Sequence, residues 1–415
     1  MKDARFDHSP QPSAYHDVRA ARQVHDASSA AKLSVMLVFG TRPELIKMLP
    51  VIRAAEAAAN VTVKTVMTSQ HKDLVRSLAK DWSIRADYDL DVMKPAQSLN
   101  DIVSRVIVRI DGILEAQKPD IVLVQGDTTS AFAGALAAFN RGIPVGHIEA
   151  GLRTANIDSP FPEEANRRLI GRIARFHFAP TLQNKKALLA ENTPTENIFL
   201  TGNTVVDSIH LVLGQQPPST PIRDIIARLH GRRVITLTTH RRESFGTVMR
   251  DRLRVLRRYV EERPDVSLIF PVHPNPQVKE LAQAELSTCE QIHLLAPLSY
   301  PDFLHCLEAS WVILSDSGGI QEEAPTLGKP LLILRDETER MESVTCGVAR
   351  LVGKSPDRLQ AELLELDKPG SWASKVHEVE NPFGRGDSGA QILDILQTWK
   401  METTQARALA TDGQR

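Results

Sequence analysis

The sequence predicts an α/β protein made of two domains, each with a parallel β-sheet that is covered by helices on both faces. Apolar runs of strand length alternate with helical patterns from residue 32 onward, and most of these runs are apolar throughout. A parallel sheet that is buried on both faces requires such strands. The chain has 415 residues, which is too many for one hydrophobic core, so two domains are expected.

The first half of the chain predicts one Rossmann-like domain over residues 32–207. Its expected strands are residues 34–39, 61–67, 121–124, 144–148, 177–180 and 198–201, and its helices include 44–59, 99–117 and 129–140. The helix at 129–140 is rich in small residues, so it can pack close to the sheet. Residues 1–31 carry His, Ser, Pro and charge but no apolar segment, which predicts a disordered extension.

A turn-rich segment at residues 214–221 lies at the start of a second Rossmann-like domain, which we assign to residues 208–380. Its expected strands are 234–238, 266–271, 292–295, 311–314 and 331–334, and its helices include 247–263 and 301–309. Residues 381–400 predict a loop and then an amphipathic helix from about residue 388, and the polar residues 401–415 predict a flexible tail. Two such domains leave a cleft at the C-terminal ends of their strands, where ligands bind.

The composition narrows the class of partner and cofactor. A net charge of -1 gives no argument for nucleic acid or an anionic membrane, and no apolar run is long enough to span a bilayer. Three scattered cysteines fit a reducing cytoplasm, where we expect the protein to reside. Metal-ligand spacings are absent from the sequence, and its Gly-x-Gly-x-x-Gly run at residues 384–389 does not follow a predicted strand as a dinucleotide motif does, so we expect neither a metal ion nor a nicotinamide cofactor.

Residues 311–334 form the stretch around which the predicted cleft is organised. An apolar strand ends in the turn Ser-Asp-Ser-Gly-Gly at 315–319, a helical pattern follows, and a second buried strand completes the unit. The glycines let the backbone approach a ligand, the serines can cap the helix, and the N–H groups at a helix start suit a phosphate. Glu322 and Glu323 suit sugar or ribose hydroxyls. An ordinary strand-to-helix turn has the same sequence pattern, so this stretch alone leaves both interpretations open.

Basic residues follow the first strand of each predicted domain. Arg42 and Lys47 come after strand 34–39, and His240 and Arg241 end the first strand of the second domain. Arginine binds phosphate oxygens, and histidine can bind them or transfer a proton. His273, at the end of the next strand, could be a second such residue. For each position taken alone, a surface arginine or a structural histidine is the alternative.

Three carboxylates come from separate segments of the first predicted domain. Asp127 and Glu149 each follow a strand, and Glu163 lies in a loop that enters a helix. Carboxylates gathered in one cleft move one another's pKa values apart, which creates acid and base roles. A single carboxylate at a strand end is usually a helix cap, but three from separate segments favour acid–base chemistry.

Long motifs in these segments resemble those of one family, the non-hydrolysing UDP-N-acetylglucosamine 2-epimerases of bacterial surface-polysaccharide synthesis. They keep the family's order from about residue 38 to residue 353, and residues 1–31 lie outside the resemblance. They include FGTRPELIKMLP, QGDTTSAFAGALAAF, VGHIEAGLRT, FPEEANRRLIGRIARFHFAPT, THRRESFG, LSYPDFL, SDSGGIQEEAPTLGKP and DETER.

The resemblance implies a glycosyltransferase-B arrangement of the two domains, a homodimer, and a UDP-sugar as substrate. It implies inversion of C-2 without NAD or metal, by proton removal with anti elimination of UDP, then re-addition to 2-acetamidoglucal. By the matching motifs, the acid–base carboxylates correspond to Asp127, Glu149 and Glu163, and the active-site histidine corresponds to His240. The basic pair corresponds to Arg42 and Lys47, and the phosphate cradle corresponds to Ser317, Gly318 and Gly319. Glu323 corresponds to a ribose contact, and Phe303 to a position near uracil. Arg241 and His273 join the substrate-binding set because of their positions at strand ends.

Some family members bind a second UDP-GlcNAc as an activator, and Gln70 and His71 match part of that site. Asp73 stands where those members tend to carry Gln, and Ala96 where they tend to carry Arg, so the match is incomplete. Three other functions use the same residues and stay open at this point. They are a hydrolysing or modified-sugar 2-epimerase, such as one acting on a 2,3-diacetamido uronate, a glycosyltransferase of the same fold, and a catalytically silent nucleotide-sugar-binding module.

Overall fold

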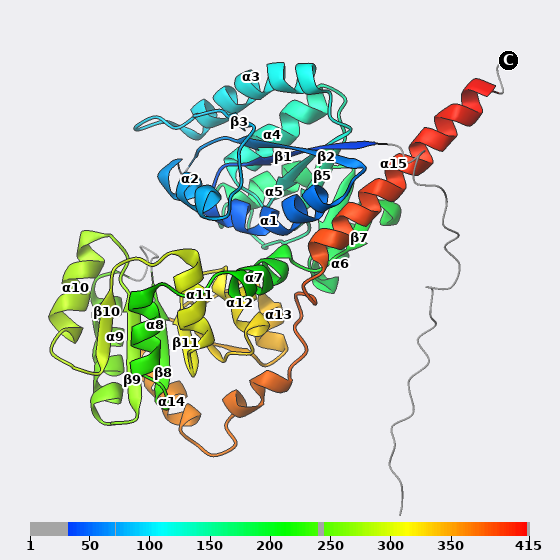
Figure 1. Cartoon of the computed structure of the whole chain (residues 1–415). Coiled ribbons are helices and arrows are strands. Elements are labelled where there is room, and N and C mark those ends of the chain that lie inside the picture. Colours follow the sequence, from blue (N-terminus) through cyan, green and yellow to red (C-terminus); the bar gives the residue numbers. More distant parts are fainter. Residues whose placement is uncertain (1–31, 71, 240–244, 413–415) are drawn as a thin grey trace, which may run out of the picture.

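The computed structural model describes residues 32–70, 72–239 and 245–412 and contains two parallel β-sheets with helices on both sides (Figure 1). The first sheet has the strand order β3-β2-β1-β4-β5-β6-β7, and the second has the order β10-β9-β8-β11-β12-β13. The order reverses between β1 and β4 and again between β8 and β11. At such a reversal a doubly wound sheet opens a crevice beyond its strand ends.

The first sheet and its helices follow the predicted alternation closely. The elements are β1 (Leu33–Phe39), α1 (Arg42–Ala57), β2 (Val61–Met67), α2 (Lys72–Asp81), β3 (Tyr88–Asp89), α3 (Leu99–Gln117), β4 (Ile121–Gln125), α4 (Thr129–Asn140), β5 (Val145–Ile148), α5 (Glu163–Ile173), β6 (Phe176–Ala179), α6 (Leu182–Ala190) and β7 (Ile198–Leu200). The two-residue strand β3 was not expected from the sequence, because two residues carry no periodicity.

The second sheet begins after two helices that were not expected from the sequence, on either side of the turn-rich segment at residues 214–221. The elements are α7 (Thr204–Gln215), α8 (Thr220–Arg228), β8 (Arg233–Thr238), α9 (Thr247–Glu261), β9 (Val266–Pro271), α10 (Pro276–Leu286), β10 (Ile292–Leu295), α11 (Tyr300–Glu308), β11 (Val312–Ser315), α12 (Ile320–Thr326), β12 (Leu331–Ile333), α13 (Met341–Thr345), β13 (Ala349–Leu351), α14 (Pro356–Leu366) and α15 (Ser388–Asp412). The turn-rich segment 214–221 thus spans the end of α7, the short break at residues 216–219 and the start of α8.

Local interactions fix where α1 begins, and this start places Arg42 at the crevice. Thr41 and Glu44 form a capping box, in which Glu44 Oε2 accepts from the Thr41 N–H over 2.6 Å. The buried Glu44 also accepts from the Gly40 N–H over 2.8 Å and from the Thr128 hydroxyl over 2.6 Å. The last contact ties the start of α1 to the start of α4, beside the strand ends.

Helix α4 packs as closely on the sheet as its small residues predict. A Cβ atom added to Gly134 would lie 3.0 Å from Cγ1 of Val38 in β1, so a larger residue there would push the helix outward. Because α4 follows β4 directly, its close packing on the sheet also fixes the short loop between them, which carries Asp127.

The C-terminal helix α15 returns to the first domain and packs on α1, α7 and β1 (Figure 1). Lys400 Nζ lies 2.7 Å from Asp120 Oδ1, and Gln397 donates to Asn60 over 2.7 Å. The helix continues to Asp412, where the sequence analysis expected a flexible tail from residue 401. Residues 401–412 contain Ala, Met, Gln, Arg and Leu, which favour continuation of a helix that is already anchored.

The chain crosses between the two domains twice, and the two crossings touch. Asn203, just before α7, donates its N–H to the carbonyl of Phe383 over 2.7 Å. A Cβ atom added to Gly202 would lie 3.3 Å from Cα of Gly384. Both glycines have positive φ angles, 80° and 113°. The outgoing and returning segments therefore run against each other at one place.

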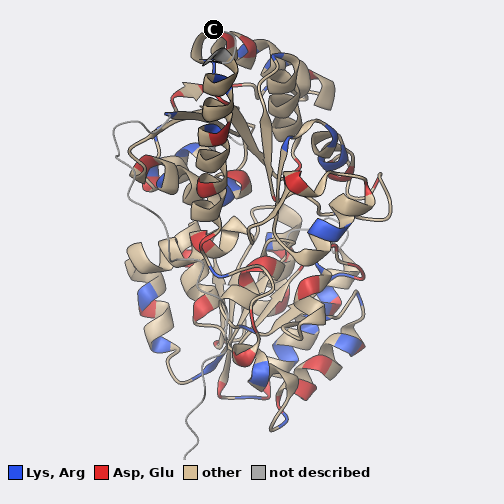
Figure 2. Cartoon of the chain, turned by 90° about the vertical axis from the view of Figure 1, so that its right-hand side faces the viewer, with Lys and Arg blue, Asp and Glu red and all other residues tan. Residues whose placement is uncertain are grey.

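Charged residues of both signs are interspersed over the two domains (Figure 2). The mixture of both signs in this view agrees with the net charge of -1. Within the described ranges, no helix combines the length and apolar character that crossing a membrane requires.

Candidate active site

Two of the predicted carboxylates follow neighbouring strands of the first sheet. Asp127 comes after β4 and Glu149 after β5, and these strands pair in parallel. Glu149 has a φ angle of 65°, in the left-handed region that residues other than glycine rarely adopt. Such backbone strain is often retained at active sites. The strand-end pattern therefore placed both carboxylates at the same sheet edge, as predicted.

Glu163 begins α5 and lies close enough to Asp127 to influence its charge. Removal from water raises the pKa of Asp127, the charges of Arg167 and Arg340 act to lower it, and Glu163 raises it further, so that the net change is upward. Arg167 Nη1 lies 3.6 Å from Asp127 Oδ2. The residue next to it, Asn166, donates to the Asp127 carbonyl over 2.9 Å. The first turns of α5 thus surround Asp127.

A buried ionic network joins the two domains at the crevice. Lys47 Nζ of α1 lies 2.6 Å from Glu149 Oε2 and 2.7 Å from Glu322 Oε2 of α12. Arg340, which precedes α13, places its Nε 2.6 Å from Glu322 Oε1 and its Nη2 3.7 Å from Glu149 Oε1. The four side chains are between 3% and 12% exposed. Gln125 also donates to Glu149 Oε2.

The two carboxylates of this network differ in proton affinity. Burial raises the pKa of Glu149 to about 7, although Lys47 acts in the opposite direction. Burial also acts to raise the pKa of Glu322, but Arg340 and Lys47 outweigh it and hold the pKa below its ordinary value. Glu322 therefore stays ionised, while Glu149 can gain and lose a proton near neutral pH.

The turn after β11 has the predicted glycines but not the predicted side-chain cap. The Ser315 hydroxyl accepts from the Ser317 N–H over 2.9 Å, and α12 has Gly319 at its start with no side-chain cap. The expectation that Ser315 and Ser317 cap this helix was therefore wrong, because the serine oxygen closes the turn itself. Gly318 lies against Arg340, since a Cβ atom there would be 2.7 Å from Nη1 of the guanidinium.

Glu323 has a different environment from its neighbour Glu322. Its Oε1 accepts from the Tyr300 hydroxyl over 3.1 Å, while its buried Oε2 has no hydrogen-bond partner among the described residues. Burial raises the pKa of Glu323 to about 7, and both Tyr300 and Arg42 act to lower it. The arrangement leaves one carboxylate oxygen of Glu323 able to accept from a ligand hydroxyl.

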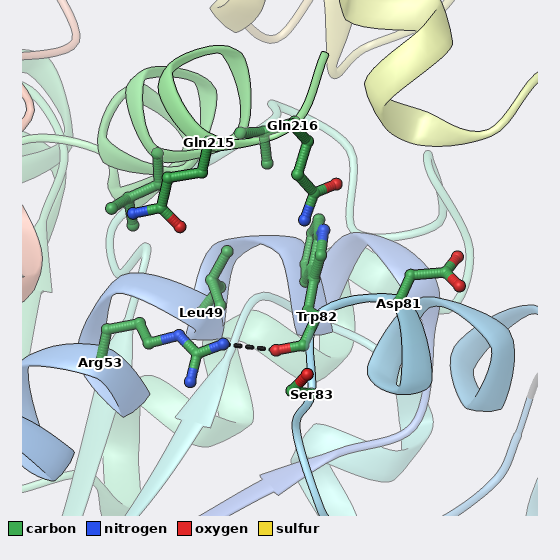
Figure 3. Close-up of a pocket in the computed structure, with 9 residues that line it drawn as sticks. Leu49, Arg53, Asp81, Trp82, Ser83, Gln215 and Gln216 are labelled. Atoms are coloured by element: carbon green, nitrogen blue, oxygen red, sulfur yellow. Dashed lines mark hydrogen bonds between the residues drawn. The ribbon is translucent and has the colours of Figure 1, made fainter. Parts of the chain in front are cut away.

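Tyr300 is supported from the other domain by Trp82, which follows α2. The two rings meet edge to face with their centroids 6.1 Å apart. Beside Trp82 a pocket of about 330 Å³ opens between α1, the end of α2 and α7, where Arg53 donates to the Trp82 carbonyl (Figure 3). The described residues that line this pocket are distinct from the predicted site residues.

Some of the remaining predicted residues lie in the described part of the structure, and others lie outside it. Phe303 on α11 is half-buried against the core, and His273 follows β9 with its Nδ1 accepting from the Asn275 N–H over 3.2 Å. Gln70 follows β2 and accepts from the Ser130 hydroxyl over 2.9 Å. Three predicted residues lie outside the described residues, so their placement stays a prediction. They are His71, His240 and Arg241.

Sequence reasoning missed two members of the ionic network. Glu322 was assigned to sugar or ribose hydroxyls, but in the structure both of its oxygens face cations. Arg340 was not singled out, although it lies in the DETER motif that carries the resemblance. The motif match was the signal that could have found it. Among the described residues, no group of three His, Cys, Asp or Glu side chains could hold a metal ion.

Comparison with known proteins identifies relatives over most of the chain. The profile of a family described as UDP-N-acetylglucosamine 2-epimerase matches residues 53–397. The UDP-N-acetylglucosamine 2-epimerase of Salmonella typhimurium is 42% identical over 374 residues, which cover 89% of this chain and 100% of the relative. The solved UDP-GlcNAc 2-epimerase of Neisseria meningitidis, bound to UDP-GlcNAc, has 42% identity and a TM-score of 0.81, covering 88% of this chain and 100% of its own.

A more distant structure bears on the fold alone. The glycotransferase of kitacinnamycin is 16% identical and has a TM-score of 0.61, covering 88% of this chain and 99% of its own. Together with the epimerase structures, this likeness confirms the predicted arrangement of two Rossmann-like domains of the glycosyltransferase-B kind. Because the family profile covers most of the chain and a relative at 42% identity is matched over its full length, the protein belongs to the UDP-N-acetylglucosamine 2-epimerase family of enzymes.

Proposed function

We propose that the protein interconverts UDP-GlcNAc and UDP-ManNAc by inverting C-2 of the sugar. A base removes the C-2 proton while the C-1–oxygen bond to UDP breaks, which gives UDP and 2-acetamidoglucal. UDP then adds back to C-1, and a proton is delivered to the opposite face of C-2. The observation that carries this proposal is the gathering of Asp127, Glu149 and Glu163 beside Lys47 and Arg340.

The carboxylates supply the proton chemistry. We assign direct roles to Asp127 and Glu149 and a supporting acid–base role to Glu163. Both Asp127 and Glu149 have pKa values raised mainly by burial, and that of Glu149 is about 7. A group with a pKa near the working pH can accept a proton in one half of the reaction and donate in the other.

The cations and the turn after β11 hold the leaving UDP. Negative charge grows on the diphosphate as the C-1–oxygen bond breaks, and fixed positive charge beside it lowers the barrier. We assign this role to Lys47 and Arg340 and to the residues that the sequence placed near phosphate. Those residues are Arg42, His240, Arg241, His273, Ser317, Gly318 and Gly319. Glu323 would accept from ribose hydroxyls, and Phe303 would lie near uracil.

A homodimer is part of the proposal, as is a role of the product in surface-polysaccharide synthesis. Neighbouring helices α3, α4 and α5 expose Val108 at 73%, Phe139 at 51% and Leu169 at 48%. A contiguous apolar patch is typical of a protein–protein interface, and we assign the dimer interface to these three helices. A dimeric mass by light scattering supports this interface, and a monomer at micromolar concentration excludes it.

The test of the reaction is a proton NMR time course of the purified protein with UDP-GlcNAc in heavy water, without added metal, NAD or acceptor. We expect UDP-ManNAc with deuterium at C-2. Free ManNAc together with UDP would mean a hydrolysing relative. An unchanged spectrum that keeps the C-2 proton would refute the proposal and favour a modified sugar or a glycosyltransferase that lacks its acceptor.

A further inference from the structure

Glu322 lies where the charges of the two domains meet, and it shares Lys47 and Arg340 with Glu149. The distances from Lys47 Nζ to the two carboxylates are nearly equal, 2.6 Å to Glu149 and 2.7 Å to Glu322. Arg340 divides its contacts unequally, because its Nε lies 2.6 Å from Glu322 while its Nη2 lies 3.7 Å from Glu149. Arg340 Nη1 also lies 2.5 Å from Glu339 Oε1, so Glu322 shares Arg340 with Glu339 and Glu149, and it shares Lys47 with Glu149.

The balance of charge in this network depends on Glu322. Two cations, Lys47 and Arg340, face Glu149 and Glu322, and Arg340 also pairs with Glu339; all five side chains are almost entirely removed from water. If Glu322 were uncharged, Lys47 would pair with Glu149 alone, and Arg340 would be shared only by Glu149 and Glu339. A carboxylate that shares its buried cations with fewer other carboxylates is a weaker base, because the cations stabilise its ionised form more strongly.

We propose that Glu322 is a positioning residue for the C-2 proton chemistry. By pairing with Arg340 and Lys47, Glu322 weakens their interaction with Glu149, so that the Glu149 carboxylate stays available to exchange a proton with the sugar. This inference rests on the proposed function. It extends that function by making the second domain part of the proton-transfer site, because α12 carries Glu322 and the first domain carries Glu149 and Lys47.

The environment of Glu149 agrees with this role. The groups that face it are Lys47 from α1, Gln125 from β4, Glu322 from α12 and Arg340 from the segment before α13. Burial makes the largest contribution to the raised pKa of Glu149, Lys47 and Arg340 act to lower the pKa, and Glu322 acts to raise it. Removal of the Glu322 charge therefore lowers the pKa of Glu149.

The experiment compares the wild type with Glu322→Gln, which is nearly the same size but uncharged. Steady-state rates are measured from pH 5.5 to 9, and UDP binding by calorimetry. We expect kcat at its plateau to fall about tenfold or more, because a weaker base transfers protons less readily. We expect the acid limb of kcat to move down by about one pH unit. The dissociation constant of UDP should rise no more than about threefold, since both cations remain.

Two further variants separate positioning from structure. Glu322→Asp keeps the charge, so its acid limb should stay near that of the wild type even if kcat falls through the shorter reach. Glu285→Gln removes a carboxylate that pairs with Arg254 over 2.9 Å between α10 and α9, away from the crevice, and should leave both kcat and the pH profile unchanged.

Three results would overturn the inference. They are an unchanged kcat in Glu322→Gln, an acid limb that does not move, and an acid limb that moves equally in Glu322→Asp. If Glu322→Gln does not fold, as judged by its melting transition, a shifted acid limb in Glu322→Asp likewise overturns it. Failure of the proposed function is distinguishable, because the wild type itself would then show no exchange of the C-2 proton in heavy water.

Discussion

Replacement of Tyr300 by Phe tests how the protein recognises the ribose of UDP. The change removes a hydroxyl that donates to Glu323 Oε1 over 3.1 Å and leaves the ring, which is 5% exposed, in its place against Trp82. Because the hydroxyl stabilises the ionised form of Glu323, its removal raises the pKa of Glu323 above the present value of about 7. Near neutral pH the carboxyl group is then mostly protonated and accepts less well from ribose hydroxyls.

The size of the effect follows from the strength of one buried hydrogen bond to a charged group. Such a bond contributes roughly 1.5–3 kcal/mol when the acceptor is ionised. Glu323 is only partly ionised near neutral pH, because its pKa is about 7. The lower end of the range therefore applies, and since 1.4 kcal/mol corresponds to a factor of ten, we expect UDP to bind about tenfold more weakly.

The assay is calorimetry at pH 7.5 with UDP and with 2′,3′-dideoxy-UDP, which lacks both ribose hydroxyls. We expect Tyr300→Phe to weaken UDP binding and to leave the binding of the dideoxy compound within about twofold of wild type. Tyr259→Phe is the matched control, because Tyr259 is 4% exposed and donates to Asp367 over 2.8 Å away from the crevice. Equal losses for the two ligands, or a similar loss in Tyr259→Phe, would refute this account of Glu323.

Three further predictions follow from the same geometry. Asp127→Asn should lower kcat by a factor of roughly 10²–10⁴ and leave the dissociation constant of UDP nearly unchanged, since it removes a proton-transfer group and no cation. Steady-state kinetics measure kcat and calorimetry measures UDP binding. Equal losses of turnover and UDP binding would indicate a structural residue. Gly318→Ala places a Cβ atom 2.7 Å from Nη1 of Arg340 and so displaces a cation assigned to the diphosphate, and UDP should bind about tenfold more weakly. Gly112→Ala is the control, because Gly112 has open space around it, and this variant should bind UDP as the wild type does. Without UDP, the stability of the wild type relative to Glu149→Gln should fall as pH rises from 4.5 to about 7, because burial has raised the pKa of Glu149 across this window and the folded state holds its proton more tightly than the unfolded state. Melting temperatures of the two proteins across this range check the sign, and a difference that stays constant or grows with pH would contradict it.

The sequence predicted the sheets well because their strands are long enough to carry a pattern. The run at residues 121–124 is apolar throughout, and it is the buried strand β4. The strand β3 has two residues, which is too short for a pattern, and the three-residue strand β13 is interrupted by Arg350, whereas the equally short β7 and β12 are apolar throughout. The strand ends then located Asp127 and Glu149, because parallel strands bring their C-terminal ends to one edge of a sheet.

The ionic network could not be predicted in the same way. Lys47 and Glu322 meet only because the two domains face each other at one relative orientation, and that orientation depends on packing over the whole interface. A local pattern specifies which carboxylates are near a turn, but not which cations reach them from another domain. The same reasoning explains why Glu322 was assigned to hydroxyls although it contacts Lys47 and Arg340.

The paired crossings near Gly202 and Gly384 determine how the two halves of the enzyme can move. A single connecting segment would act as a tether and would allow one domain to twist and slide past the other. Two segments in contact at one place form a local connection, and we expect rotation about this place to be the main motion of the second domain. We expect each such rotation to bring Glu322 and Arg340 back to the same position relative to Lys47. A single cut in either segment would still leave both halves joined through the other.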